Sequence, residues 1–375
     1  MECYGGYNND INVLKKSSSG GIFYELATDV LKKNGIVFGA AFKTDGTVYL
    51  KGVKTINELD ECLGSKYVQA KTNDIYKSVE NALKRQIKVL FCGTPCQCNA
   101  LNRYLNGKYS SNLLIVDFVC HGVPSEKIWK KYLNYLEADV ECCDISFRDK
   151  KDGWDNYGIK IKKKNGEIYF EHHGKDKYFK LFINDLILRP SCYSCQAKGQ
   201  QRTSDITLGD LWGNELNPNG SSLIIVNSKN GNLALNAISD RIHLNKISYK
   251  LEKSNRSYYK SCTLPYRRAS VFKALKKDGE IFFDRIEEYT KISTAERALC
   301  KLQRKVESKL SGTRQSYLDK ECKKNCCGCG ACVNACSLGA ISMIPDEEGF
   351  EYPQIDRKKC CSCGQCKKAC FCQSV

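Results

Sequence analysis

Two regularly spaced cysteine runs near the C-terminus constrain this chain more than any other feature of its sequence. Each run follows the spacing C-x2-C-x2-C-x3-C, and both lie within residues 321–375. The first run is Cys326, Cys329, Cys332 and Cys336, and the second is Cys360, Cys363, Cys366 and Cys370. In such a run the first three thiolates bind one [4Fe–4S] cubane, and the fourth thiolate binds the other cubane. The sequence therefore predicts two [4Fe–4S] clusters in this segment.

This crossed ligation assigns four thiolates to each cluster. One cluster is predicted to be held by Cys326, Cys329, Cys332 and Cys370, and the other by Cys360, Cys363, Cys366 and Cys336. A pair of zinc sites is the alternative. An ordinary four-cysteine zinc site, however, does not use a third cysteine after x2 and a fourth after x3 in the same run. The remaining cysteines of the two runs are predicted to bind no metal: Cys327, Cys361 and Cys372.

The segment between the two runs, AISMIPDEEGFEYPQID, resembles the hairpin of bacterial two-cluster ferredoxins. Those ferredoxins usually place proline after each fourth cysteine, where this chain has Ser337 and Phe371. Proline fixes φ but ligates nothing, so we expect altered local rigidity and no loss of a cluster. The resemblance implies a small α+β ferredoxin-like domain over residues 321–375.

The composition favours thiolate ligands over disulfides. The chain has 24 cysteines in 375 residues, and no apolar stretch in it approaches the ~20 residues of a membrane span. Its N-terminus lacks the basic and apolar segment of a secretory signal. We therefore expect a soluble, cytoplasmic protein, and the oligomeric state, including a homo-oligomer, stays open.

The formal net charge is +17, which favours acidic partners. A redox partner protein or an anionic redox cofactor is the expected partner. The lysines are spread along the chain, with no long basic run and no aromatic-interleaved patch of the kind that RNA binders carry. The charge therefore predicts a solvated lysine-rich surface and no nucleic-acid binding.

Residues 1–285 alternate strand-like and helix-like patterns. Buried strands are predicted at 36–42, 88–92 and 113–120, with helical stretches between them, and antiparallel strands at 142–172. This alternation predicts an α/β large domain with a mixed, largely parallel sheet. Residues 286–320 are predicted to be a helical linker, because residues 292–311 have the pattern of a polar amphipathic helix.

Four cysteines of the large domain are predicted to converge. Cys96 lies in the first turn of a helix that follows a strand, and Cys120 leaves the next strand. In a parallel sheet both loops emerge at the carboxyl edge, where ligands bind. Cys192 and Cys195 add a C-x2-C pair. From spacing alone, a third [4Fe–4S] cluster, a zinc site and ordinary buried cysteines all stay open.

The large domain resembles the coenzyme F420 hydrogenase/dehydrogenase beta-subunit family over about residues 4–270. The motifs that carry the resemblance are SSSGGIF at 17–23, GSKYVQA at 64–70, GTPCQ at 93–97, CHGVPS at 120–125, RPSCYSC at 189–195 and SDITLGDLWG at 204–213. The resemblance implies FAD, an iron–sulfur cluster in the large domain and, in many members, a two-cluster ferredoxin. It thus favours a cubane that is held by Cys96, Cys120, Cys192 and Cys195.

No GxGxxG or P-loop pattern is present, so the implied FAD site is not a Rossmann site. The helix start at residues 17–21 is the first candidate for the pyrophosphate, because free N–H groups and the helix dipole favour anions. A capped helix start without a ligand is the alternative. The candidate cofactor-binding residues are Ser17, Ser18, Ser19, Gly20, Gly21, Ser65, Lys66, Tyr67, Gln69 and Thr94.

Two residues are candidates for catalysis. Lys66 would meet a phosphate or the negative charge that develops on the flavin. His121 would donate a proton to a substrate, or serve as a substitute ligand if one of the four cysteines points away. A histidine that is only hydrogen-bonded within its loop is the alternative.

The sequence therefore predicts a flavin- and iron–sulfur-dependent oxidoreductase. Electrons would pass between the C-terminal clusters, a large-domain cluster, FAD and an organic substrate or deazaflavin cofactor. The alternative is a non-catalytic electron-transfer subunit that feeds a partner enzyme. The ferredoxin usually precedes the SSSGG domain in the family and follows it here, so docking on its own large domain or on a neighbouring chain's stays open.

Overall fold

The computed structural model describes residues 2–138, 144–213, 215–248, 255–291, 298, 317–320 and 322–372. The predicted helix at 292–311 lies outside the described residues, apart from residue 298. In the described part of the chain, no helix is both long and apolar enough to cross a bilayer.

A mixed sheet of eight strands forms the centre of the described large domain. Its order is β11-β1-β10-β9-β5-β4-β2-β3. The four strands β9, β5, β4 and β2 are parallel, and the remaining neighbours pair antiparallel. The strands are β1 (Glu2–Asn8), β2 (Ile36–Phe42), β3 (Val48–Val53), β4 (Val89–Gly93), β5 (Leu113–Phe118), β9 (Ile206–Asp210), β10 (Ser222–Val226) and β11 (Ile242–Lys246). The predicted α/β architecture with a parallel core is confirmed.

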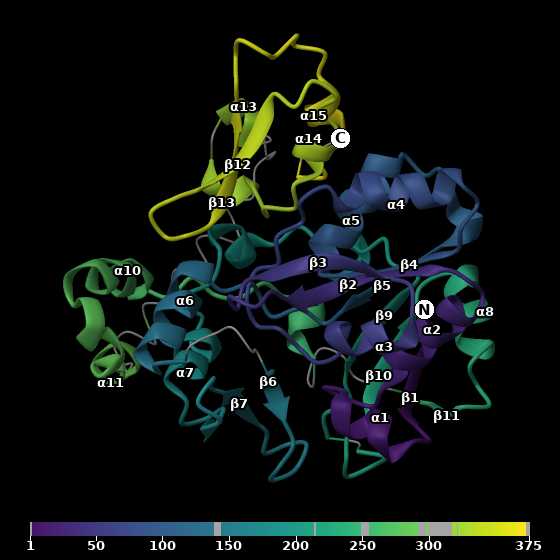
Figure 1. Cartoon of the computed structure of the whole chain (residues 1–375), viewed down its shortest axis with the longest axis horizontal. Helices are drawn as coiled ribbons and strands as arrows, with labels where there is room; N and C mark the ends of the chain where they lie inside the picture. Colours follow the sequence, from purple (N-terminus) through teal and green to yellow (C-terminus); the bar gives the residue numbers. More distant parts are fainter. Residues whose placement is uncertain are drawn as a thin grey trace.

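The helices cover both faces of this sheet (Figure 1). Residues of α2 and α8 pack on one face and residues of α4 and α5 on the other. Parallel strands buried on both faces are mostly apolar, and Leu113–Phe118 shows this pattern except at Asp117, which is buried in an ion pair with Arg202. The larger helices are α1 (Ile11–Lys16), α2 (Ile22–Lys32), α4 (Ile75–Lys84), α5 (Pro95–Leu105), α6 (Glu126–Tyr135), α7 (Lys177–Ile183), α8 (Lys229–Asn236), α10 (Arg268–Lys277) and α11 (Ile286–Thr290); α3 (Ile56–Leu59) and α13 (Tyr317–Lys320) are shorter.

A second, three-stranded sheet accounts for the antiparallel strands predicted at 142–172. It consists of β6 (Asp144–Asp149), β7 (Gly158–Lys162) and β8 (Ile168–His172), in that order. Its apolar side chains join those of α6, α7 and α10 in a separate core.

The C-terminal segment, residues 322–372, forms a hairpin and two short helices. The hairpin joins β12 (Ile341–Pro345) to β13 (Glu351–Ile355), and the helices are α14 (Ala331–Asn334) and α15 (Gln365–Lys368). The segment (yellow in Figure 1) lies against the end of the large domain that carries α4 and α5. Phe350 and Tyr352 belong to the core of α6, α7 and α10, and Ala331 and Ala369 to that of α4 and α5. The segment therefore docks on the large domain of its own chain.

Candidate functional site

A pocket opens at the carboxyl ends of β4 and β5. The two strands are parallel neighbours, with Cys92 opposite Val116, so the loops that follow them emerge side by side. Cys96 lies in the first turn of α5, after Thr94, whose backbone N–H donates to the Gln97 side chain at 3.0 Å. Cys120 follows β5 directly. Both cysteines line the pocket, as the α/β pattern predicted.

The other two predicted cysteines complete the same pocket. Cys192 lies in the 3-10 turn η3 (Pro190–Ser194), and Cys195 follows this turn. Two backbone N–H groups point at their sulfurs, from Val123 to Cys192 and from Ala197 to Cys195, each at 3.4 Å. All four predicted cysteines of the large domain therefore line one pocket.

The C-terminal segment supplies the opposite wall of this pocket. Lys324, Cys327, Phe371 and Cys372 line it together with the large-domain cysteines. Cys327 hydrogen-bonds to Cys96, and this bond, with a further one from Thr94, lowers the pKa of Cys96 to about 7. Burial instead raises the pKa of Cys120 to about 12. Cys327 and Cys372, predicted to be spare, thus lie where the two parts of the chain meet.

The spacing of the sulfurs distinguishes a cluster from a single zinc ion. A tetrahedral zinc site with Zn–S bonds of about 2.3 Å brings its thiolates to roughly 3.8 Å from one another. Among the described residues, no three cysteines have sulfurs within 4.8 Å of one another. A cubane is larger than a single ion and holds its thiolates further apart. The four pocket sulfurs are therefore more widely spaced than a single zinc ion would hold them.

The cysteines of the C-terminal runs gather in two groups. Burial raises the pKa of the Cys332 thiol, and the neighbouring Cys329, Cys326 and Cys370 raise it further. This is the set that crossed ligation assigns to one cluster.

The second group includes the fourth cysteine of the first run. The Cys366 thiol has its pKa raised by burial first, and then by Cys336 and Cys360. Cys363 and the spare Cys361 are exposed. Three of the four thiols assigned to the second cluster are thus electrostatic neighbours.

Glycines open the short helix of each run in the same way. Gly330 precedes α14 with φ +70°, and Gly364 precedes α15 with φ +75°. This left-handed conformation favours glycine, which has no Cβ. Gly330 also has no room for a side chain, because a Cβ would lie 2.3 Å from Thr72 Oγ1. The repeated geometry matches the doubled sequence run.

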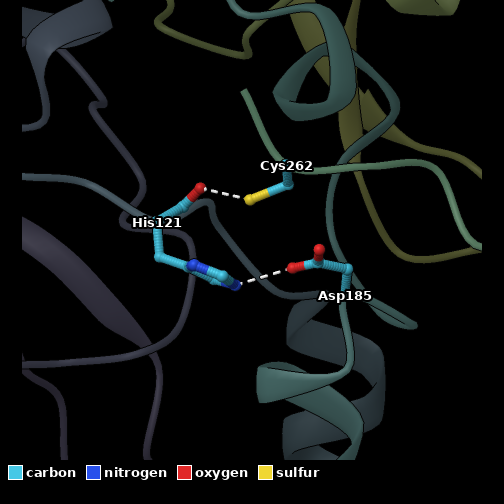
Figure 2. A group of neighbouring side chains, drawn as sticks. All are labelled: His121, Asp185 and Cys262. Atoms are coloured by element: carbon cyan, nitrogen blue, oxygen red, sulfur yellow. Dashed lines mark hydrogen bonds and ion pairs between the residues drawn. The ribbon is translucent and has the colours of Figure 1, made fainter. Parts of the chain in front are cut away.

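His121 lies on the pocket wall beside Asp185. The Nε2 atom of His121 lies 2.7 Å from Asp185 Oδ1, and the Cys262 thiol donates to the His121 carbonyl at 2.7 Å (Figure 2). The three side chains offer ligand atoms within 4.8 Å of one another. Burial raises the pKa of Cys262, which keeps it a neutral donor. Sequence reasoning found His121 but missed Asp185 and Cys262, which lie far along the chain and belong to no motif.

The two segments proposed for the cofactor meet in space. The Ser18 hydroxyl accepts from the Ser65 backbone N–H at 2.6 Å and hydrogen-bonds to the Ser65 hydroxyl at 2.8 Å. Gly21, in the left-handed conformation, precedes α2 and supplies no side chain to cap its first N–H groups. Ser19 and Gly20 are anchored to β10, through Ser221 and Ser222.

The remaining cofactor candidates are spread over two places. The Lys66 ammonium donates to the backbone carbonyls of Leu63 and Gly64, and burial lowers its pKa to about 8. The Tyr67 hydroxyl accepts from Arg148 at 3.4 Å. Gln69 and Thr94 lie elsewhere: Gln69 Nε2 donates to the Cys327 carbonyl, and Thr94 Oγ1 lies 3.1 Å from Cys96 Sγ. These two side chains contact the cysteine pocket region and not residues 17–21.

A basic and aromatic group beside residues 17–21 was not predicted. Lys150 donates to three backbone carbonyls, including that of Ser19 at 3.1 Å, and burial lowers its pKa to about 7. Trp154 donates to the Ser18 carbonyl and stacks on Trp212, with ring centroids 4.8 Å apart. Trp212 belongs to the quoted GDLWG motif, whereas no motif marks Lys150 or Trp154.

The fold and the pocket define an α/β protein with a cysteine-rich site at the carboxyl edge of its sheet. Residues 87–250 match the sequence model of a family described as the C-terminal part of the beta subunit in coenzyme F420 hydrogenase/dehydrogenase. This match supports the family that the motifs of the chain predicted.

Several solved chains have a similar fold. One of them is a chain of the F420-reducing [NiFe] hydrogenase complex from Methanosarcina barkeri, with 16% sequence identity and a TM-score of 0.50. The match covers 74% of this chain and 93% of that chain. At this identity the likeness concerns the fold alone. No curated protein matches the chain.

Proposed function

We propose that the chain is a flavin- and iron–sulfur-dependent oxidoreductase that passes electrons between ferredoxin-type clusters and an organic substrate or deazaflavin cofactor. The observation that carries the proposal is the shared pocket. Cys96, Cys120, Cys192 and Cys195 line it from the large domain, and Cys327 and Cys372 line it from the segment of the two cysteine runs. The name of the family, hydrogenase/dehydrogenase, agrees with oxidoreductase chemistry.

The proposed division of labour has three parts. Residues 1–285 form the oxidoreductase domain, residues 286–320 the linker and residues 321–375 the two-cluster domain. The four large-domain cysteines would hold a third [4Fe–4S] cluster, and the two C-terminal runs one cluster each. Bound clusters transfer single electrons, whereas a flavin exchanges one or two, so their combination couples single-electron flow to hydride chemistry.

FAD is proposed for the region where residues 17–21 meet residues 65–69. The uncapped start of α2 offers backbone N–H groups to an anion. Lys66 and Lys150 lie in the same region with lowered pKa values of about 8 and about 7, and Trp154 and Trp212 offer aromatic surface. Lys150 donates to the Ser19 carbonyl, so its proposed role is to fix the loop and not to contact the ligand.

His121 is proposed to handle protons at the pocket. Asp185 Oδ1 lies beside its Nε2, and the Cys262 thiol donates to its backbone carbonyl. The four cysteines all line the pocket, so His121 is not needed as a substitute ligand.

The second candidate function is a non-catalytic electron-transfer subunit. The structure of similar fold is part of a hydrogenase complex, which favours partner subunits. Cytoplasmic location and a redox partner protein fit both functions. Turnover by the isolated chain with an added electron donor distinguishes the two, since an adaptor has none without its partner.

The test is anaerobic purification of the full chain with iron, sulfide and flavin quantification. We expect three clusters and one FAD per chain. Replacing Cys120 or Cys192 by alanine should remove about one cluster, that is, about four irons, while the exposed Cys361→Ser variant retains all of them. One zinc and no iron in the pocket, or a reconstituted sample without flavin, contradicts the corresponding part of the proposal.

A further inference from the structure

We infer that Arg189 is the charge-compensating residue between the two neighbouring cluster sites, where it raises the reduction potential of the cluster held by Cys326. The inference rests on the proposed function, because it requires clusters in the C-terminal runs. Arg189 precedes the Cys192–Cys195 pair, and its side chain is fully buried where the C-terminal segment docks.

The Arg189 guanidinium donates hydrogen bonds to Cys326 of the first cysteine run and to the start of β13. Nε donates to the Cys326 carbonyl at 2.7 Å, and Nη2 donates to Cys326 Sγ at 3.6 Å and to the Glu351 carbonyl at 2.7 Å. Nη1 donates to Gln69 Oε1 at 2.9 Å. The guanidinium also lies over the Tyr352 ring, 4.4 Å from its centroid. Its acceptors are carbonyls, an amide oxygen and a sulfur, none of which is a carboxylate.

A buried guanidinium without an anion is costly. Among the ion pairs of the described residues, none includes Arg189, and the groups that act most on its charge are Cys326, Tyr352, Cys327 and Cys192. Removing a cation from water is unfavourable unless a counter-charge compensates it. Protonated thiols carry no charge, whereas thiolates bound to iron do. The position of Arg189 therefore calls for the negative charge of a bound cluster.

Arg189 faces both cluster sites. Cys326 belongs to the set with Cys329, Cys332 and Cys370, and Cys192 belongs to the pocket. Its side chain contacts Cys326, and its backbone carbonyl accepts from the Cys192 N–H at 2.9 Å, so one residue adjoins both sites.

Reduction of a cluster adds one electron and hence one negative charge. A positive charge and an N–H···S hydrogen bond stabilise the reduced form more than the oxidised form, and both raise the reduction potential. Arg189 supplies both to the cluster of Cys326. The effect on the pocket cluster is electrostatic alone, so it should be smaller.

Arg268 offers a matched control at the same interface. It donates to the Leu188 carbonyl and pairs with Glu348 of the C-terminal segment at 2.8 and 2.5 Å. Its charge is already neutralised by that carboxylate. Arg268 therefore helps to dock the segment without an unpaired charge near the sulfurs.

The experiment is an anaerobic redox titration of the full chain, followed by electron paramagnetic resonance, with iron counted in each sample. The variants are Arg189→Gln, Arg189→Lys and Arg268→Gln. Arg189→Gln should retain its iron and shift the midpoint of one C-terminal cluster to a more negative potential. Arg189→Lys keeps the charge and should shift less, and Arg268→Gln should leave the midpoint unchanged. An Arg189→Gln midpoint equal to wild type, with full iron content, overturns the inference.

Gln69→Glu tests the same charge without removing the arginine, and it serves if Arg189→Gln does not fold. The new carboxylate would pair with Arg189 at the position of Gln69 Oε1, so the midpoint should again become more negative. An unchanged midpoint counts against the inference. A wild-type chain that binds no iron would instead refute the proposed function itself, which separates the two failures.

Discussion

At the scale of single residues, cysteines that belong to runs of the same spacing have different surroundings. Cys326 is half-buried and receives a hydrogen bond from Arg189, whereas Cys361 and Cys363 are exposed. Cys327 is one residue from Cys326, yet it contacts Cys96 of the large domain. The chemistry of each thiol therefore depends on its neighbours in space more than on its place in the run.

Single cysteine replacements test the crossed ligation. Cys326→Ser and Cys360→Ser should each remove about one cluster, because a cubane needs all four thiolates. Iron and sulfide quantification of the anaerobically purified full chain measures the loss, with Cys361→Ser as the control. Full iron retention in both variants would refute the assignment.

At the scale of elements, the start of α2 depends on close backbone packing. Gly20 lies between β1 and β10, where a Cβ would be 2.4 Å from the Gly6 carbonyl oxygen and 2.7 Å from the Ser222 backbone nitrogen. The serines before it contact Ser65 and Ser221 through their hydroxyls. The loop can present its N–H groups to an anion only if this packing is kept.

Gly20→Ala should therefore displace the loop and lower the bound flavin several-fold, while iron per chain stays unchanged. The reason is that backbone atoms on both sides cannot move aside as a flexible side chain does. Flavin absorbance, and FAD released by denaturation, measure the outcome. Gly174→Ala, where no atom lies within 4 Å of the added Cβ, is the control. Equal flavin content in both variants would show that residues 17–21 do not hold the cofactor.

At the scale of the whole molecule, the C-terminal segment is part of the packed structure. Phe350 is 1% exposed and lies in the same core as α6, α7 and α10. Asn334 donates to the Asn73 carbonyl at 2.7 Å, and Arg103 donates to the Lys368 carbonyl at 2.9 Å. Apolar and polar contacts thus attach both halves of the segment to the large domain.

Phe350→Ala should release the hairpin from the large domain. Loss of a buried phenylalanine costs about 3–5 kcal/mol, which is a large fraction of the net stability of a domain. Hydrogen exchange of the amides in β12 and β13 should rise, while β4 and β5 stay protected. Ile344→Ala, on the same hairpin but 46% exposed, should change neither. Unchanged exchange in Phe350→Ala would mean that other contacts hold the segment.

The sequence by itself determined the elements and much of the candidate site. Mainly apolar runs predicted the strands Ile36–Phe42 and Leu113–Phe118, because strands buried on both faces have few polar side chains. Thr94 and Pro95 marked the start of α5. The strand ends then predicted that Cys96 and Cys120 lie close together, since neighbouring parallel strands end at the same edge of a sheet.

Only the tertiary structure decided which distant groups share a site. Asp185 and Cys262 reach His121, and Arg189 reaches Cys326, through contacts between segments that no local period connects. Gln69, which was predicted to bind the cofactor with residues 17–21, contacts the docked C-terminal segment for the same reason. The spare Cys327 and Cys372 became part of the pocket wall. Local patterns encode strands, turns and caps, whereas docking depends on shape and charge across whole surfaces, which a linear pattern does not record.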